Sequence, residues 1–390
     1  MGKHVLCVSE LGAGAGHLAP MMKIARHLRA LDPTVQITFA VYDPFFAQAT
    51  FGEDGFPFLA CPIPMAADGG VSNTGSFAEI LSYCGFLHED RLTFSLQIWD
   101  SLFDLVKPDL ILADYSPTAC LAARGRIPVA SVGSGYTLPP ANIHEYPALR
   151  IGYASPRFQD RMCDVINAEL KARHQAVLDC LPHVLATEIR GVFAIPQSDP
   201  YGRLRADPLL GSYDGNIPPM PPREDGGIFL YRGGSALDLA KIVEGAVSLG
   251  RPIEAYLGPF QSAERQFLLG FGVTVHDKVP DLLEVLEHSR VIVSGAGAGL
   301  TQAAMQAGRP QLCLPAHMES DLNATRVVDL NVGLKLGRIS DSAIMRDGLK
   351  SILEDPSFTR NAQALAQEIS QLPLPSDPVG VLAQAILKTI

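Results

Sequence analysis

The chain is poor in the residues that mark several common classes of protein. Its seven cysteines are scattered over 390 residues, are odd in number and form no C-x-x-C pair. That spacing excludes the usual zinc and thioredoxin motifs, and no other constellation of metal-ligating residues stands out. We therefore expect no bound metal, and we expect the cysteines to be small apolar core residues in a reducing compartment.

Long apolar runs and basic stretches are also missing. No apolar run reaches the length of a membrane span, and the N-terminus enters an expected strand with no signal peptide before it. Asp and Glu outnumber Lys and Arg by 41 to 31, the net charge is -10, and no basic stripe interrupts this balance. These features argue against nucleic acid as a partner. We expect a cytoplasmic protein, with peripheral membrane contact left open.

Apolar residues are abundant instead. The chain is 47% hydrophobic and 18% charged, enough for two domains with sizeable cores. Short apolar runs alternate with segments of helical spacing, which predicts parallel sheets covered by helices on both faces. The expected helices include 18–31, 77–107, 116–124, 361–371 and 379–388. The expected strands are 5–9, 35–41, 110–113, 128–132, 228–231, 253–257, 273–275, 291–293 and 311–314.

This alternation occurs twice, and a stretch rich in proline and glycine separates the two halves. We divide the chain into a Rossmann-like domain at 1–200, a linker at 201–225, a second Rossmann-like domain at 226–375 and a C-terminal helix at 376–390. The fold class is α/β, with two Rossmann-like domains expected to face a central cleft.

Each half contains a glycine-rich turn between an expected strand and an expected helix. Such a turn suits anionic ligands, because the N–H groups at the start of a helix are unpaired. The first turn has Gly12, Gly14 and Gly16. It departs from the dinucleotide pattern G-x-G-x-x-G, because its third glycine comes one position early and a histidine follows it. A nicotinamide-dependent enzyme is therefore the weakest interpretation.

His17, at the tip of this turn, is well placed to act as a general base. Asp114 ends a strand that we expect in the same sheet, so both side chains should lie at one edge, where the carboxylate would orient the imidazole. Simpler interpretations also stand: His17 as a cap of the following helix, and Asp114 as a helix N-cap.

Gly16-His17-Leu18-Ala19-Pro20 resembles the G-H-x-x-P turn of the family 1, UDP-glycosyltransferase-like, glycosyltransferases. These are inverting, metal-independent enzymes of the two-domain GT-B fold. The resemblance implies that His17 and Asp114 are the catalytic pair. It also implies an acceptor site in the N-terminal domain near Gly16, Ser134 and Tyr136, and a nucleotide-sugar site in the C-terminal domain. No cofactor beyond the sugar nucleotide as co-substrate is implied.

The second turn carries the longer match, which runs without a gap from Gly295 to Ala324. The family pattern there is H-G-G-x-G-T-x-x-E-A, then G-x-P, then P-x-x-x-D-Q-x-x-N-A. Arg232 and Ser294 are candidate phosphate ligands, although Arg232 could equally form a surface or interdomain salt bridge. The donor-binding residues that we propose from this match are Arg232, Gly234, Ser235, Val279, Ser294, Gly297, Gly299 and Glu319.

The chain departs from the family pattern at side chains that bind the donor. Gly295 replaces the histidine at pyrophosphate, Leu300 the hydroxyl residue at phosphate, Ala303 the glutamate at ribose and Ser320 a glutamine. Asp281 replaces the glutamine that frames the base. Hydrogen bonds to charged groups are worth about 1.5–3 kcal/mol each, so these losses weaken donor binding unless other groups replace them.

Two functions follow from these residues. The first is an inverting glycosyltransferase that moves a sugar to a hydroxyl of a small apolar acceptor, with a His–Asp base. The aromatic residues of the N-terminal half could line such an acceptor pocket, although most of them are expected to be core. The alternative is a GT-B relative whose sugar-nucleotide site is lost or repurposed, acting as another kind of enzyme or as a binding protein.

Overall fold

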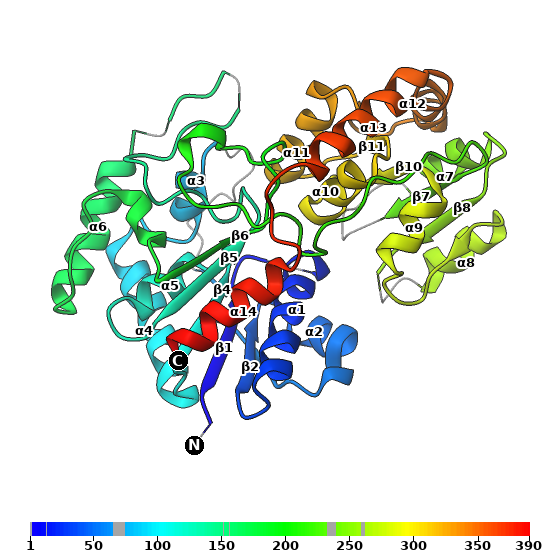
Figure 1. Cartoon of the computed structure of the whole chain (residues 1–390). Coiled ribbons are helices and arrows are strands. Elements are labelled where there is room, and N and C mark those ends of the chain that lie inside the picture. The colour runs from blue at the N-terminus through cyan, green and yellow to red at the C-terminus, as the bar shows by residue number, and fades with distance from the viewer. Residues whose placement is uncertain are drawn as a thin grey trace. The chain divides into compact units, whose positions relative to one another are not determined.

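The computed structural model describes residues 2–12, 14–64, 75–150, 152–155, 157–231, 239–258 and 262–390. The chain divides into two compact units, Met1–Tyr213 with Asp377–Ile390, and Asp214–Ser376. The division lies within the stretch rich in proline and glycine, and the chain returns to the first unit at its end. The helix α14 (Pro378–Thr389) lies beside α1 (Ala15–Leu31) in that unit (Figure 1).

The first unit contains one parallel sheet of six strands in the order β3-β2-β1-β4-β5-β6. This is the strand order of a doubly wound, Rossmann-like fold. Its strands are β1 (His4–Ser9), β2 (Gln36–Val41), β3 (Phe58–Ala60), β4 (Leu110–Asp114), β5 (Val129–Gly133) and β6 (Ile189–Val192). Its other helices are α2 (Pro44–Phe51), α3 (Phe77–Tyr83), α4 (Glu89–Val106), α5 (Pro117–Ala123) and α6 (Gln159–Ala172).

Alternating residues of β1 supply cores on both faces of this sheet. Leu6 and Val8 belong to the core that α3, α4, α5 and α6 cover. Val5 and Cys7 belong to the core that α1, α2 and α14 cover. Both faces are therefore buried, as the continuous apolar strands predict.

The second unit repeats this architecture. Its six parallel strands have the order β12-β11-β10-β7-β8-β9, which is the same doubly wound pattern. They are β7 (Gly227–Tyr231), β8 (Ile253–Tyr256), β9 (Thr274–Val275), β10 (Ser289–Ser294), β11 (Gln311–Cys313) and β12 (Gly333–Lys335). The described helices are α7 (Leu239–Val247), α8 (Ser262–Gly270), α9 (Leu282–His288), α10 (Ala298–Ala307), α11 (Met318–Asp329), α12 (Ser342–Glu354) and α13 (Pro356–Ser370).

The α/β class and the two Rossmann-like domains are confirmed, but one expected helix is wrong. The segment 77–107 forms two helices, α3 and α4, because the chain turns at Gly85, whose φ of 89° suits glycine. Three strands were missed from the sequence: β3, β6 and β12. Each has only three or four residues, several of them only half-buried, so the apolar pattern is too short to identify them.

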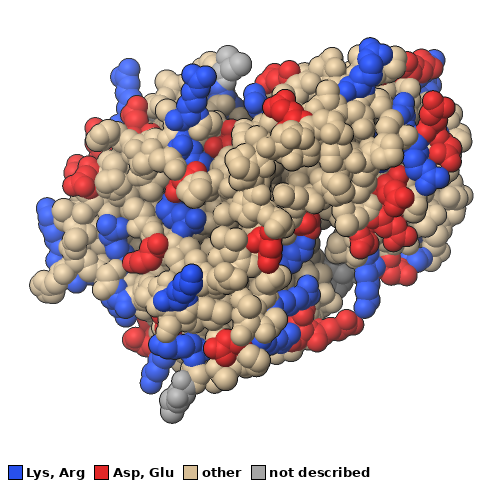
Figure 2. All heavy atoms as spheres, viewed as in Figure 1, with Lys and Arg blue, Asp and Glu red and all other residues tan. Residues whose placement is uncertain are grey.

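The surface agrees with the charge pattern of the sequence. Figure 2 shows Lys and Arg interspersed with Asp and Glu on the face in view, with no extended basic stripe among the described residues. Five of the seven cysteines are buried, while Cys163 and Cys180 are partly exposed. None of the described helices has the length and apolarity that crossing a lipid bilayer requires.

Candidate active site

His17 and Asp114 meet at the carboxyl edge of the first sheet, where the strand order reverses. Strand β1 pairs with β2 on one side and β4 on the other, so the crevice beyond β1 and β4 is the point where doubly wound sheets bind ligands. His17 lies in the first turn of α1, and Asp114 is the last residue of β4. Nδ1 of His17 lies 2.6 Å from Oδ2 of Asp114.

The burial of this pair differs between its members. The side chain of Asp114 is 4% exposed and that of His17 is 21% exposed. Because a carboxylate only accepts hydrogen bonds, Nδ1 donates, and Nε2 is the nitrogen that can take up a proton. The capping interpretations are wrong, because the N-cap residues of α1 and α5 are Gly14 and Ser116.

Two neighbours fix the imidazole ring of His17. A Cβ at Gly12 would overlap the ring and the hydroxyl of Ser9, so this first glycine is needed for close approach rather than for a ligand. Tyr115 stacks on the ring with centroids 5.7 Å apart and an interplanar angle of 12°. Tyr115 has a φ of 48°, an uncommon conformation for a residue with a side chain, and such residues cluster at functional sites.

Further aromatic side chains surround Tyr115. Phe77 and Tyr136 have ring centroids 6.2 and 6.5 Å from that of Tyr115. Tyr146 packs on Phe77 at 5.2 Å. Most other aromatic residues of this half are core, including Trp99 and Phe103, whereas the side chains of Phe45 and Phe94 are exposed. Of the candidate pocket residues, the structure thus places Phe77 and Tyr136 next to Tyr115, which stacks on His17.

Glu10, which the sequence did not identify, lies beside the segment that follows Asp114, where its N–H donates to Oγ of Ser116. Glu10 follows β1, and it is fully buried. Its carboxylate accepts hydrogen bonds from the backbone N–H groups of Thr118 and Ala119, at 2.9 and 3.2 Å, in the first turn of α5. Burial raises the pKa of the Glu10 carboxyl to about 7. Hydrogen bonds from Thr118, Ala119 and the Trp99 side chain act in the opposite direction and favour a lower pKa.

This raised pKa predicts that Glu10 makes the first unit less stable at alkaline pH. A carboxyl with a higher pKa in the folded state stabilises the fold below its unfolded pKa, and that contribution is lost as pH rises through about 7. Between pH 5 and pH 8 we expect a loss of about 2–3 kcal/mol from this group. Urea unfolding followed by the fluorescence of Trp99, the only tryptophan, measures it. The loss should be absent in Glu10→Gln, and an equal pH dependence in both proteins would contradict it.

The loop after β5, which contains the acceptor candidates Ser134 and Tyr136, closes on itself. The N–H of Ser134 donates to Oγ1 of Thr137 at 2.9 Å, and the N–H of Thr137 donates to Oγ of Ser134 at 3.2 Å. Both Ser134 and Tyr136 are buried. Gly16, the third acceptor candidate, is exposed in the first turn of α1, and a Cβ there would meet nothing within 4 Å.

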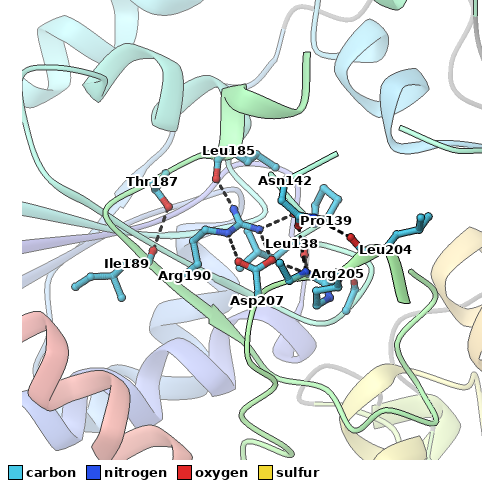
Figure 3. Close-up of polar contacts among 12 residues, drawn as sticks. Leu138, Pro139, Asn142, Leu185, Thr187, Ile189, Arg190, Leu204, Arg205 and Asp207 are labelled. Carbon is cyan, nitrogen blue, oxygen red and sulfur yellow. Dashed lines mark hydrogen bonds and ion pairs between the residues drawn. The ribbon is translucent and has the colours of Figure 1, made fainter. Parts of the chain in front are cut away.

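Two arginines hold this loop in place. Arg205 donates to the carbonyl oxygens of Gly135 and Leu138 at 2.7 and 2.9 Å. Arg190, on β6, donates to that of Pro139 at 2.7 Å. Figure 3 shows both guanidinium groups turned toward Asp207 and toward the loop backbone. The loop after β5 therefore depends on side chains about 50–70 residues further along the chain.

Two aspartates neutralise these arginines. Arg205 binds both carboxylate oxygens of Asp199 at 2.9 and 3.0 Å, and each side chain of this pair is 2% exposed. Asp207 accepts from Arg190 at 2.7 Å and from Arg205 at 3.3 Å. Burial alone would raise the pKa of Asp207, but the bonds and charges of the two arginines outweigh it and lower that pKa. Asp207 is therefore ionised at neutral pH.

The second glycine turn lies at the matching place in the second sheet, between β10 and α10. The N–H of Ala296 donates to Oγ of Ser294 at 3.1 Å, and Nδ2 of Asn323 donates to the carbonyl of Ala296 at 3.0 Å. Gly297 is the N-cap of α10. A Cβ at Gly297 or Gly299 would meet nothing within 4 Å, so the backbone of this turn is open to a ligand.

Among the residues that depart from the family pattern, Ser320 and Ala303 have structural roles of their own. Oγ of Ser320 accepts from the N–H groups of Ala316 and His317 at the start of α11. Ala303 is fully buried in the core under α10. Of the other donor candidates, Glu319 is half-buried in the first turn of α11 and Val279 is 53% exposed. Arg232, Gly234 and Ser235 lie outside the described residues.

Two Rossmann-like units in one chain, each with a glycine turn at its switch point, define the class as a GT-B α/β protein. Residues 261–385 match the family described as erythromycin biosynthesis protein CIII-like, C-terminal domain. The chain is 27% identical over 289 residues to the elloramycin glycosyltransferase of Streptomyces olivaceus, which covers 70% of this chain and 67% of that protein.

A shorter match has 28% identity over 152 residues to the aclacinomycin-T 2-deoxy-L-fucose transferase of Streptomyces galilaeus. It covers 38% of this chain and 34% of that protein. Among solved structures, spinosyn rhamnosyltransferase complexed with thymidine diphosphate has a TM-score of 0.65 at 18% identity, covering 99% of this chain and 100% of that one. The chain therefore has the GT-B fold and is similar in sequence to glycosyltransferases of secondary metabolism.

Proposed function

We propose that this enzyme transfers a sugar, with inversion, from a thymidine diphosphate sugar to a hydroxyl of an apolar, aromatic acceptor. The observation that carries the proposal is the 2.6 Å contact between Nδ1 of His17 and Oδ2 of Asp114 at the switch point of the first sheet. A carboxylate-bound imidazole of this kind has a fixed tautomer and a stabilised charged form.

The reaction is a single displacement. Nε2 of His17 takes the proton from the acceptor hydroxyl as the oxygen attacks the anomeric carbon. The bond from that carbon to the diphosphate oxygen breaks, and the nucleoside diphosphate leaves with the bonding electrons. Asp114 stabilises the imidazolium that forms, because its carboxylate is already bonded to Nδ1.

The acceptor class follows from the surroundings of His17. Tyr115 lies against the imidazole, with Phe77 and Tyr136 next to it, so a flat apolar molecule would find aromatic partners beside the base. Two relatives are named for elloramycin and aclacinomycin, which supports a secondary metabolite as the acceptor. The spinosyn rhamnosyltransferase was also solved with the spinosyn aglycone, at 19% identity and a TM-score of 0.64.

The donor class rests on the second glycine turn. Gly295 has no side chain, and the side chains of Leu300 and Ala303 are apolar, so these three positions offer no polar side chain to a nucleotide. The backbone of the turn nevertheless stays open at Gly297 and Gly299. Phosphate binding by the backbone of the turn and by the first N–H groups of α10 compensates in part for the missing polar side chains. Thymidine diphosphate is the nucleotide found in the structural relative. The relatives named above are sugar transferases, which speaks against a lost or repurposed donor site.

Filling the open turn is expected to weaken nucleotide binding. Gly297→Val places two methyl groups where phosphate would approach, at a φ of -64° that valine tolerates, so the fold should persist. We expect the Kd of thymidine diphosphate to rise at least about tenfold, or about 1.4 kcal/mol, measured by calorimetry.

Gly270→Val is the matched control, because a Cβ at Gly270, at the end of α8, also meets nothing within 4 Å. It should bind thymidine diphosphate as the wild type does. Uridine and guanosine diphosphates in the same experiment test the choice of nucleotide. If the wild-type protein binds none of the three, the proposed function is wrong.

A further inference from the structure

Two loops meet at the catalytic pair, and one buried carboxylate bridges them. The first loop, after β1, leads from Glu10 to His17. The second, after β4, runs from Asp114 through Tyr115 and Ser116 to α5. Glu10 contacts the second loop through both its backbone and its side chain. The proposed mechanism gives this carboxylate no part.

The backbone contact reaches Asp114 itself. The N–H of Glu10 donates to Oγ of Ser116 at 2.9 Å, and that hydroxyl donates to the carbonyl oxygen of Asp114 at 2.8 Å. Between them stands Tyr115, in its uncommon backbone conformation. The side chain of Glu10 meanwhile holds the start of α5, through the N–H groups of Thr118 and Ala119.

We infer that Glu10 is a positioning residue, whose ionised carboxylate anchors the turn that presents Asp114 to His17. This inference rests on the proposed function. Only an ionised carboxylate accepts from both N–H groups of α5 with full strength, because protonation turns one oxygen into a donor. Loss of the proton should therefore align Asp114, and uptake of the proton should loosen it.

The described groups that face Glu10 keep their charge in the pH range of this titration, so the titration can be assigned to the Glu10 carboxyl. Three thiols lie near it: Cys61 after β3, Cys84 at the end of α3 and Cys120 on α5. Burial raises the pKa of Cys61 and Cys120 to about 12 and that of Cys84 well above its ordinary value. All three therefore stay neutral between pH 5.5 and 8.5. The indole of Trp99, from α4, is the fourth neighbour and bonds to the carboxyl.

Trp99 makes the ionisation of Glu10 visible, because it is the only tryptophan in the chain. We expect the fluorescence of the full-length wild-type enzyme to change with a midpoint near pH 7, and Glu10→Gln to abolish that change. Sugar transfer at pH 8 should show kcat about tenfold lower in Glu10→Gln, with KM for donor and acceptor within twofold of the wild type.

Glu188→Gln is the matched control. Its carboxylate accepts the backbone N–H of Val129 at 2.8 Å, at the start of β5 and away from the catalytic loops. It should keep both kcat and the fluorescence titration. Ser116→Ala, which leaves Glu10 in place, provides a second variant should Glu10→Gln fail to fold, and it should lower kcat several-fold.

The variant His17→Ala distinguishes a failure of the inference about Glu10 from a failure of the proposed function. If His17→Ala is inactive while Glu10→Gln or Ser116→Ala keeps the kcat of the wild type, the inference about Glu10 is overturned and the proposed function stands. If His17→Ala itself stays active, the proposed function fails instead.

Discussion

Replacing His17 with alanine is expected to lower kcat by about 10²–10⁴-fold, the range that a positioned general base contributes. The acceptor hydroxyl would then have to lose its proton to water. The Kd of thymidine diphosphate should not change, because the proposed donor residues belong to the second unit. Steady-state kinetics and calorimetry on the same preparation measure the two effects.

His27→Ala is the matched control for this prediction. His27 lies on the same helix, its side chain is 45% exposed, and its Nε2 lies 3.6 Å from Asp377. It should keep the kcat of the wild type. Asp114→Asn should lose activity to a similar extent as His17→Ala, because an amide presents a donor to Nδ1 and selects the other tautomer. A His17→Ala variant that keeps more than a tenth of kcat would refute the assignment.

Replacing Arg205 with methionine is expected to destabilise the first unit by about 3–5 kcal/mol. The change leaves the carboxylate of Asp199 buried without the guanidinium that binds both of its oxygens. Removing one partner of a buried ion pair destabilises a protein by about this amount. It also frees the carbonyls of Gly135 and Leu138, so the loop after β5 should loosen. Urea unfolding followed by Trp99 fluorescence reports on the first unit alone, because that unit contains the only tryptophan.

Arg26→Met tests whether burial of the ion pair is the reason for the loss of stability expected of Arg205→Met. Arg26 also binds both carboxylate oxygens of an aspartate, Asp54, at 2.7 Å each, but its side chain is 48% exposed. Exposed pairs are worth about 0–1 kcal/mol, so this variant should unfold almost as the wild type does. Equal losses of stability in the two variants would show that burial of the Arg205 pair is not decisive.

The sequence predicts the parts of this fold that depend on local pattern. Continuous apolar runs mark β1, β2, β4 and β5, because strands buried on both faces need no polar alternation. The spacing over 77–107 predicts one helix, whereas the structure has α3 and α4 there. The difference arises because the chain turns at the single residue Gly85, despite helical spacing on either side of it. The short strands β3, β6 and β12 owe their position to pairing with neighbours in the sheet rather than to their own residues.

The candidate site divides in the same way. His17 and Asp114 could be paired from the sequence, because parallel strands place their carboxyl ends along one edge. Glu10 could not be identified, because its partners lie about 110 residues away in another loop and no motif marks it. The Arg205 network likewise joins residues far apart in the chain. Contacts of this kind depend on the three-dimensional arrangement and leave no local signal.

The measurement that tests the central claim most directly is the anomeric configuration of the product. The wild-type enzyme would be given an α-linked thymidine diphosphate glucose and a planar phenolic acceptor, and the coupling of the anomeric proton would be read by NMR. A single displacement assisted by His17 should yield the β-glycoside, with almost none formed by His17→Ala. An α-glycoside, or β-glycoside formed equally fast without His17, would contradict the account.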